Sequence, residues 1–179
     1  MERVLDTGSP NRLKVETVAK ALVIVESPAK AETIGRYLGD EFVVESSVGH
    51  IRDLATKKEL PPELQEESWA HLGVETENNF KPHYVTSEHS ERTVRNLKKA
   101  LKGASELYLA TDEDREGEAI AWHLQKVLEP TVPVHRMVFH EITKRAITEA
   151  VSNCRELDDS LVSAQETRRI LDRLYGFEV

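Results

Sequence analysis

Two short apolar runs that end in acidic residues constrain the fold of this chain more than any other feature. Residues 21–26 read ALVIVE, and residues 106–111 read ELYLAT and lead directly into DEDREGE. A continuous apolar run of this length is typical of a strand buried on both faces, as in a parallel sheet. Binding sites in such sheets form beyond the carboxyl ends of the strands. The two runs therefore predict both the centre of the fold and the place of a site.

Strands and helices alternate along most of the chain. Pro28 fits the first turn of a helix after the first run, and Gly39 fits its end, which predicts a helix over 28–38. A later helix carries four apolar side chains on one face, those of Ile120, Leu124, Val127 and Leu128. This order predicts an α/β fold with a central parallel sheet flanked by helices on both faces. The other expected elements are strands at 42–46, 83–86 and 135–139 and helices at 87–102, 143–153 and 159–175.

Two segments depart from this alternation. Residues 1–19 are mixed polar, with Gly, Ser and Pro together, and are interpreted as a flexible tail. Residues 50–80 are rich in Glu and Pro, which predicts an irregular insertion with weak strand character at 72–76.

Composition excludes several classes of protein. The chain of 179 residues has no apolar run of membrane-spanning length and no signal peptide, so we expect no membrane contact. Its single cysteine, Cys154, excludes an internal disulfide and a cysteine-based zinc site, and favours a reducing, cytoplasmic location. The net charge of -8 disfavours nucleic-acid binding, unless the acids bind a cation or the basic residues cluster.

Four acidic residues lie where the two central strands end: Glu26 after the first, and Asp112, Asp114 and Glu116 after the second. If the strands are neighbours, the carboxylates converge and repel one another unless a cation intervenes. Oxygen ligands without His or Cys favour Mg²⁺. The simpler alternative is an acid-rich helix N-terminus stabilised by the helix dipole, which we would favour for one acid but not for four. Gly117 then lets the backbone turn into the next helix at close quarters.

Basic and polar residues nearby are candidates for phosphate contacts. Lys30, with Ser27, lies at a helix N-terminus, which can hold a phosphate. Arg115 lies between two of the acids and is free to point toward a phosphate. His50 follows a strand, two serines and a glycine, so a nucleic-acid contact and a purely structural place are equally open.

The last predicted helix is amphipathic. One face carries Gln165, Arg168, Arg169, Asp172 and Arg173, and the other carries Ala164, Thr167, Ile170, Leu171 and Leu174. The simpler interpretation is that the charged face contacts only solvent. The alternative is that it binds the phosphates of a DNA strand.

Five strings occur here in an order that closely resembles bacterial type IA DNA topoisomerases, from their start through the TOPRIM domain: LVIVESPAKAETI, SSVGHIRDL, LYLATDEDREGEAIAWHL, VFHEIT and AQETRRILDRLYG. The resemblance implies a Rossmann-like TOPRIM domain at 20–140 and the helical start of the adjoining DNA-binding domain at 141–179. It implies that Glu26 is the catalytic glutamate, that Lys30 and Arg115 stabilise the scissile phosphate, and that Asp112 and Asp114 bind Mg²⁺ with support from Glu116. It further implies single-stranded DNA contacts by His50 and the charged face of the last helix.

The activity implied by the resemblance is ATP-independent relaxation of negative supercoils, through a 5′-phosphotyrosine link to one cut strand. Nothing in the sequence matches the YPRTDS-type segment that carries the family's tyrosine, so we expect a fragment that is inactive alone and works with the remaining domains. The alternatives are a stand-alone TOPRIM nuclease or primase-like enzyme, and a binding module without catalysis.

Overall fold

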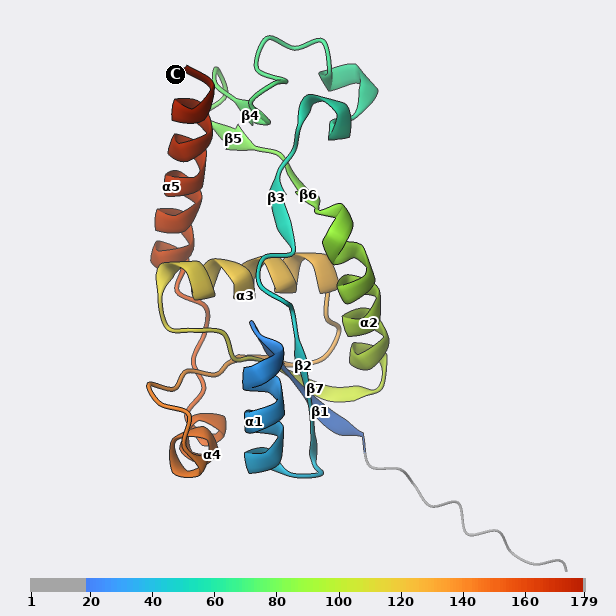
Figure 1. Cartoon of the computed structure of the whole chain (residues 1–179), viewed down its shortest axis with the longest axis vertical. Coiled ribbons are helices and arrows are strands. Elements are labelled where there is room, and N and C mark those ends of the chain that lie inside the picture. The colour runs from blue at the N-terminus through green and yellow to red at the C-terminus, as the bar shows by residue number, and fades with distance from the viewer. Residues whose placement is uncertain (1–18, 179) are drawn as a thin grey trace, which may run out of the picture.

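A four-stranded parallel sheet forms the centre of the molecule. The computed structural model describes residues 19–178, so the predicted tail lies outside the described residues except for its last position. The strand order is β2-β1-β7-β8 (Figure 1). The bounds are Lys20–Val25 for β1, Phe42–Ser46 for β2, Ala104–Leu109 for β7 and Val134–Arg136 for β8. The predicted α/β fold with a central parallel sheet is confirmed.

The two central strands are the two apolar runs. Leu22, Val23, Ile24 and Val25 are at most 1% exposed, because helices cover both faces of β1. The edge strand β2 instead alternates between half-buried and exposed residues. The last strand ends at Arg136, earlier than the sequence predicts, although the following Met137 is also buried.

Two helices cover each face of the sheet. On one face, α2 (Glu91–Lys102) and α3 (Arg115–Leu128) pack against Leu22 and Ile24 of β1. On the other, α1 (Pro28–Leu38) and α4 (Lys144–Ser152) pack against Val23 and Val25. A short turn, η3 (Glu88–Ser90), leads into α2. The chain leaves β1 toward β2 on one side and later adds β7 on the other. The carboxyl ends of β1 and β7 therefore flank the topological switch point, where such folds bind their ligands.

A two-stranded antiparallel ribbon leads away from the sheet to a small lobe (Figure 1). The ribbon pairs β3 (Arg52–Leu54) with β6 (Tyr84–Thr86). The lobe holds a hairpin of β4 (Val74–Glu75) and β5 (Lys81–Pro82), the turns η1 (Lys57–Glu59) and η2 (Pro62–Leu64), and a core around Leu60 and Trp69. The segment predicted as an irregular insertion is thus largely irregular, but it contains the unpredicted strand β3.

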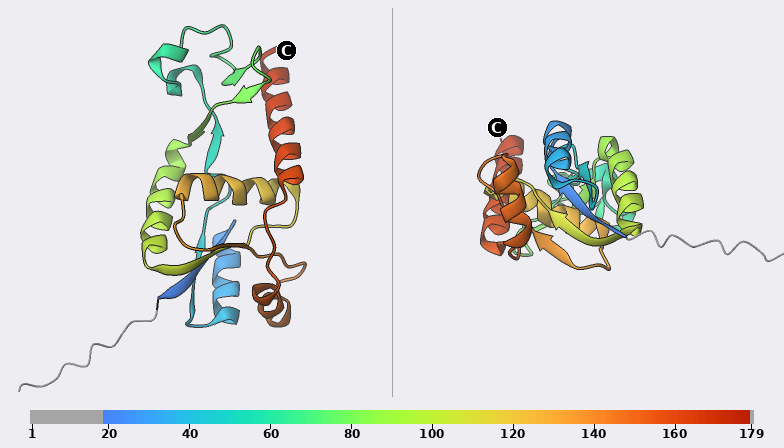
Figure 2. Two further views of the ribbon diagram at one scale, coloured as in Figure 1. Left: turned by 180° about the vertical axis from the view of Figure 1, so that it is seen from behind. Right: turned by 90° about the horizontal axis from the view of Figure 1, so that it is seen from below.

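The long helix α5 (Asp159–Glu178) runs along one side of the ribbon, opposite α2 (Figure 2). Ile170 and Leu174 pack against Leu54 of the ribbon and Leu72 and Val74 of the lobe. Leu171 was predicted on the same apolar face but is 48% exposed, because a step of one residue turns it away from the Ile170–Leu174 stripe. No helix between residues 19 and 178 combines the length and apolar character that a membrane span requires.

Candidate functional site

The acids at the ends of β1 and β7 come together, because these strands are parallel neighbours. The Lys30 ammonium lies between them: it donates to Glu26 Oε1 and, at 2.7 Å, to Asp112 Oδ1. Ser27 caps α1 by accepting a hydrogen bond from the Lys30 backbone nitrogen, which fixes the first turn and the place of the lysine. The residues that end two distant apolar runs therefore form one ionic cluster at the switch point.

The charges of this cluster are mutually dependent. Partial burial opposes protonation of Lys30, but its bonds to Asp112 and Glu26 outweigh that effect and raise its pKa above the ordinary value. For Asp112, desolvation favours the neutral acid, yet the Lys30 ammonium prevails and lowers the carboxyl pKa. Glu26 Oε2 is buried with no hydrogen-bond partner among the described atoms. The cluster thus holds charge at neutral pH and leaves one carboxylate oxygen unsatisfied, which is costly.

The other two acids lie at the start of α3. Asp114 is the N-cap of that helix, and its Oδ1 accepts from the Gly117 nitrogen at 2.7 Å. Glu116 contacts His50 at 2.9 Å between Oε1 and Nε2. His50 reaches this point because the backbone turns at Gly49, whose φ of 81° suits glycine and whose nitrogen donates to the Glu26 carbonyl oxygen at 2.8 Å. Loop 46–50, β1 and α3 therefore converge on the same place.

Arg136 is a residue of this region that sequence reasoning missed. Its guanidinium is buried at the end of β7 and donates to the carbonyl oxygens of Leu109, Thr111, Asp112 and Met137. It also donates to Glu118 at 3.0 Å, and Glu118 has no exposed surface. The available signal was an arginine between mostly apolar residues in VHRMVF, and a glutamate directly before the apolar stretch AIAW. Arg136 thus fixes the backbone that carries Asp112.

The charged residues of α5 divide into two groups. Arg169 makes a bidentate pair with Asp53 of β3, both bonds at 2.7 Å, and Arg173 donates to the carbonyl oxygens of Leu54, Ala55 and Leu72. Arg168 is more exposed and lies 4.0 Å from Asp172. Gln165 and Arg168 line a hollow with Asp114, Arg115 and Glu116. Of the predicted DNA-contacting residues on α5, Gln165 and Arg168 therefore lie nearest to the acids.

The Toprim domain family model matches residues 21–142, well over half of the chain. The chain belongs to the Toprim domain family.

Relatives of this Toprim chain confirm the resemblance to bacterial topoisomerases. It is 62% identical over 160 residues to DNA topoisomerase 1 of Streptomyces coelicolor, covering 89% of this chain and 17% of the relative. It is 58% identical over 157 residues to DNA topoisomerase 1 of Synechococcus elongatus, covering 87% and 18%. The structure of full-length topoisomerase I from Thermotoga maritima matches with a TM-score of 0.72 and 44% identity, over 86% of this chain and 24% of that chain. The Toprim chain thus spans under a fifth of the length of these curated relatives.

The carboxylates at the carboxyl ends of β1 and β7 are the candidate ligands of a divalent cation. Between residues 19 and 178, no three His, Cys, Asp or Glu side chains are grouped closely enough to hold a metal ion. The donor set is nevertheless suitable, because Glu26, Asp112, Asp114 and Glu116 offer only carboxylate oxygens, the ligands of hard cations. The buried, unpaired Oε2 of Glu26 is the kind of atom that a cation would satisfy. The chemistry of the residues therefore fits such an ion.

Proposed function

We propose that this chain is the metal-binding Toprim part of an ATP-independent DNA topoisomerase, which cuts and reseals one strand and relaxes negative supercoils. The observation that carries the proposal is the meeting of Glu26 and Asp112, with Lys30 between them, at the switch point of the sheet. The 62% identity to a protein named DNA topoisomerase 1 supports it. In the cell, this part would act on chromosomal DNA in the cytoplasm, together with the remaining domains of a longer enzyme.

Each residue of the cluster has a proposed task. Glu26 would donate a proton to the leaving 3′ oxygen when the strand is cut and take it back from the 3′ hydroxyl when the strand is resealed, and Lys30 and Arg115 would stabilise charge on the scissile phosphate. Glu26, Asp112 and Asp114, supported by Glu116, would hold Mg²⁺, which supplies further neutralisation of phosphate charge when bound. His50 and the charged residues of α5 would contact the single-stranded DNA, and residues 141–179 would begin the adjoining DNA-binding domain.

The attacking tyrosine is proposed to come from outside these 179 residues. Tyr84 donates to Glu166 at 3.1 Å, and Tyr108 donates to Glu106 at 2.8 Å. Desolvation and the partner carboxylate raise the pKa of Tyr108 to about 12, and the same two causes raise the pKa of Tyr84. A phenol held in its neutral form is a poor nucleophile. Tyr175 is exposed on α5, on the stretch of that helix that packs against the small lobe.

A chimaera tests the proposed function directly. Residues 20–179 should replace the matching segment of the Streptomyces coelicolor relative, and relaxation of supercoiled plasmid should be measured with Mg²⁺. We expect relaxation by the chimaera and none after Glu26→Gln, because the leaving 3′ oxygen then has no proton donor and the 3′ hydroxyl has no acceptor on resealing. A folded chimaera that leaves plasmid supercoiled would contradict the proposal.

The same assay on the chain alone distinguishes the alternative, a stand-alone Toprim nuclease or primase-like enzyme. We expect unchanged supercoils after treatment with detergent and protease, because no group in the chain retains the phosphodiester bond energy. Mg²⁺-dependent nicks that disappear with Asp112→Asn would instead establish a nuclease. A protease-sensitive DNA adduct would show that one of the chain's own tyrosines reacts.

Metal binding should be visible in the melting temperature of the chain. Mg²⁺ at millimolar concentration is expected to raise the melting temperature progressively, because an ion that binds only the folded state stabilises it by mass action. The double variant Asp112→Asn with Asp114→Asn should lose this response. The double variant Glu63→Gln with Glu66→Gln, in the lobe, is a matched control that should keep it. An unchanged Mg²⁺ response in the first variant would remove these residues from the metal site.

The arginines of α5 should differ in their effects on DNA binding. Arg168→Ala is expected to weaken binding of single-stranded DNA and to lower the salt slope by about 1, with little effect on the melting temperature, because the side chain is exposed and can contact a phosphate. Arg169→Ala is expected to lower the melting temperature, because it leaves Asp53 without its bidentate partner. Fluorescence anisotropy across a salt series and thermal melts measure both. Equal effects of the two variants on melting would contradict this division.

A further inference from the structure

The outer face of α2 carries a surplus of positive charge. Val94, Leu97 and Leu101 are buried against the sheet side, so the opposite side of the helix faces solvent. That side holds one acid, Glu91, and five exposed cations, which are Arg92, Arg95, Lys98, Lys99 and Lys102. No other helix between residues 19 and 178 has a surplus of more than one cation. The function proposed above assigns no task to this face.

Four of these cations form one row along the helix, the basic stripe. They follow the spacing i, i+3, i+7 and i+10 and are Arg92, Arg95, Lys99 and Lys102. This spacing confines them to an arc of about 80° around the helix axis, and the row is about 15 Å long. The helix therefore holds its cations in a straight and rigid arrangement.

Most charges of the basic stripe lack an acidic partner. Arg95 lies 3.5 Å from Glu91 one turn away, and both side chains are mostly exposed. Arg92, Lys99 and Lys102 make no ion pair in the part of the chain that the structure describes. Like charges one turn apart on a helix destabilise it. A polyanion that neutralised the stripe would relieve this repulsion.

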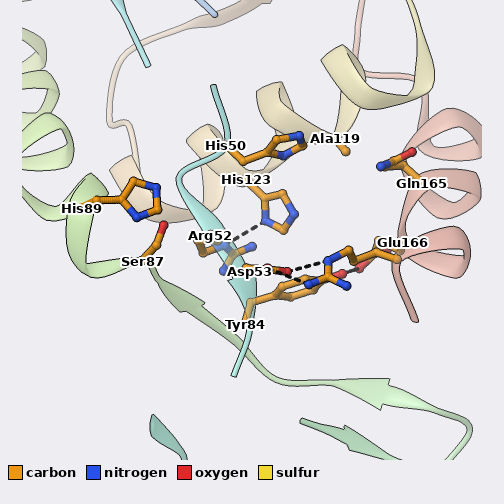
Figure 3. Close-up of a pocket in the computed structure, with 11 residues that line it drawn as sticks. His50, Arg52, Asp53, Tyr84, Ser87, His89, Ala119, His123, Gln165 and Glu166 are labelled. Carbon is orange, nitrogen blue, oxygen red and sulfur yellow. Dashed lines mark hydrogen bonds and ion pairs between the residues drawn. The ribbon is translucent and has the colours of Figure 1, made fainter. Parts of the chain in front are cut away.

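The helix α2 begins beside the histidine that is proposed to contact the single strand. Ser90, directly before α2, donates through its hydroxyl to the carbonyl oxygen of His50 at 3.3 Å. Figure 3 shows His89 of η3 on one side of His50 and Gln165 of α5 on the other. A nucleic acid that passes from α5 across His50 would therefore reach the start of α2, where Arg92 forms the near end of the basic stripe.

The chemistry of the stripe favours a duplex over a single strand. Proteins that bind single strands without sequence preference stack the bases on aromatic rings, and α2 has no aromatic residue. A row of cations alone suits the phosphates of a duplex, which carries about one negative charge per 1.7 Å of its axis. Over about 15 Å, the basic stripe would span about four base pairs.

We propose that the basic stripe of α2 binds the phosphate backbone of duplex DNA that continues from the single-stranded segment at the acidic site. The proposal rests on the proposed function for the kind of polyanion, and it goes beyond that function by assigning a second DNA surface. The net charge of -8 does not oppose this contact, because the basic residues cluster on one helix.

Removal of charge along the stripe tests the duplex contact. The quadruple variant Arg92→Gln, Arg95→Gln, Lys99→Gln and Lys102→Gln places a good helix former at each exposed position, and a thermal melt verifies its fold. Binding of a blunt duplex of about 20 base pairs is measured by fluorescence anisotropy across a salt series. The variant should bind at least about tenfold more weakly and lower the salt slope by about 3 to 4, because each lost phosphate contact releases about one counterion fewer. The double variant Arg92→Gln with Lys99→Gln should show about half of the change in slope.

The matched control removes the same charge elsewhere. It also replaces two exposed arginines and two exposed lysines, on α1, η1 and α4, and is Arg36→Gln, Lys58→Gln, Lys144→Gln and Arg145→Gln. This control should keep the salt slope of the parent, because the slope counts phosphate contacts rather than net charge.

Arg168→Ala separates the two DNA surfaces. It should weaken binding of a 12-nucleotide single strand more than binding of the duplex, because Arg168 lies beside the acidic site. The quadruple variant of the stripe should show the opposite order. Loss of single-strand affinity as large as the loss of duplex affinity in the stripe variant would assign the stripe to the single strand and overturn the inference.

Three further results would also overturn it. They are parental duplex affinity and salt slope in the stripe variant, an equal loss in the matched control, and displacement of the duplex by poly-aspartate at a similar concentration of charge. The last would assign the stripe to an acidic protein segment. A parent chain that binds the single strand but no duplex would overturn this inference alone, whereas a parent that binds neither would overturn the DNA contact of the proposed function as well.

Discussion

Arg136→Met is expected to lower the free energy of unfolding by about 3–5 kcal/mol, the usual cost of removing one partner of a buried ion pair. Arg136 is 2% exposed and Glu118 is 0% exposed, so neither charge is screened by water. Methionine fills similar volume but removes the guanidinium donor from four carbonyl oxygens, of which that of Leu109 also accepts from the Met137 nitrogen at 2.9 Å. Urea denaturation followed by circular dichroism measures the loss, which corresponds to a fall in melting temperature on the order of 10 °C.

The matched control for this prediction is the same substitution at an exposed arginine. Arg145 on α4 pairs with Glu149 one turn away, and its side chain is 88% exposed. Arg145→Met should change the free energy of unfolding by about 0.5 kcal/mol or less. If Arg136→Met proves equally mild, the buried pair contributes little to the fold, and Arg136 is not the anchor of the Asp112 backbone.

The buried pair also explains how the site and α5 are connected. Besides Arg136, Glu118 accepts from Arg155 at 2.8 Å and from the Asp158 nitrogen at 2.7 Å, directly before α5 begins. Those bonds outweigh the effect of burial and lower the pKa of Glu118, which keeps it charged. One carboxylate thus joins the end of the sheet, the helix α3 and the start of α5. The backbone of Asp112 and the first turn of α5 are held by the same group.

The sequence was sufficient to predict the centre of the fold. The runs at 21–26 and 106–111 are apolar almost throughout, which is typical of a strand covered on both faces, and both lead into acidic residues. Their pairing was a condition of the sequence argument and is supplied by the structure, and the meeting of Glu26 with Asp112 follows from that pairing. The close approach at Gly117 was also predicted, from a glycine between a strand and a helix. These inferences depend on local patterns.

Contacts between distant segments could not be predicted in the same way. Arg169 lies 116 residues from its partner Asp53, and nothing local to α5 indicates that this arginine binds a ribbon rather than solvent. Strand β3 has two charged residues among three, so no apolar period marks it. Lys30 was assigned to a phosphate from its place at a helix start, and its bonds to two carboxylates depend on the sheet order. Tertiary pairing decides each of these features.

Gly117→Ala is expected to destabilise the chain by about 3 kcal/mol and to abolish its response to Mg²⁺. A Cβ at this position would lie 2.1 Å from the Asp112 carbonyl oxygen and 2.8 Å from the Asp112 nitrogen, so the backbone must move. The same turn holds the Asp114 cap and the bond from the Thr111 hydroxyl to the Gly117 oxygen at 2.6 Å. Moving the backbone therefore displaces Asp112 and Asp114 together.

Gly176→Ala provides a control of opposite sign for this prediction. Gly176 lies in α5, and a Cβ added there would meet no described atom within 4 Å apart from its chain neighbours and the nearby helix backbone, so alanine should stabilise the helix by at most about 1 kcal/mol. Thermal melts with and without Mg²⁺ measure both quantities in each variant. If the Gly117→Ala chain has a lower melting temperature but keeps the full Mg²⁺ response, metal binding does not depend on the conformation of this turn. In that case the ion binds without Asp112 and Asp114, and the cation site must be sought at Glu26 and Glu116 instead.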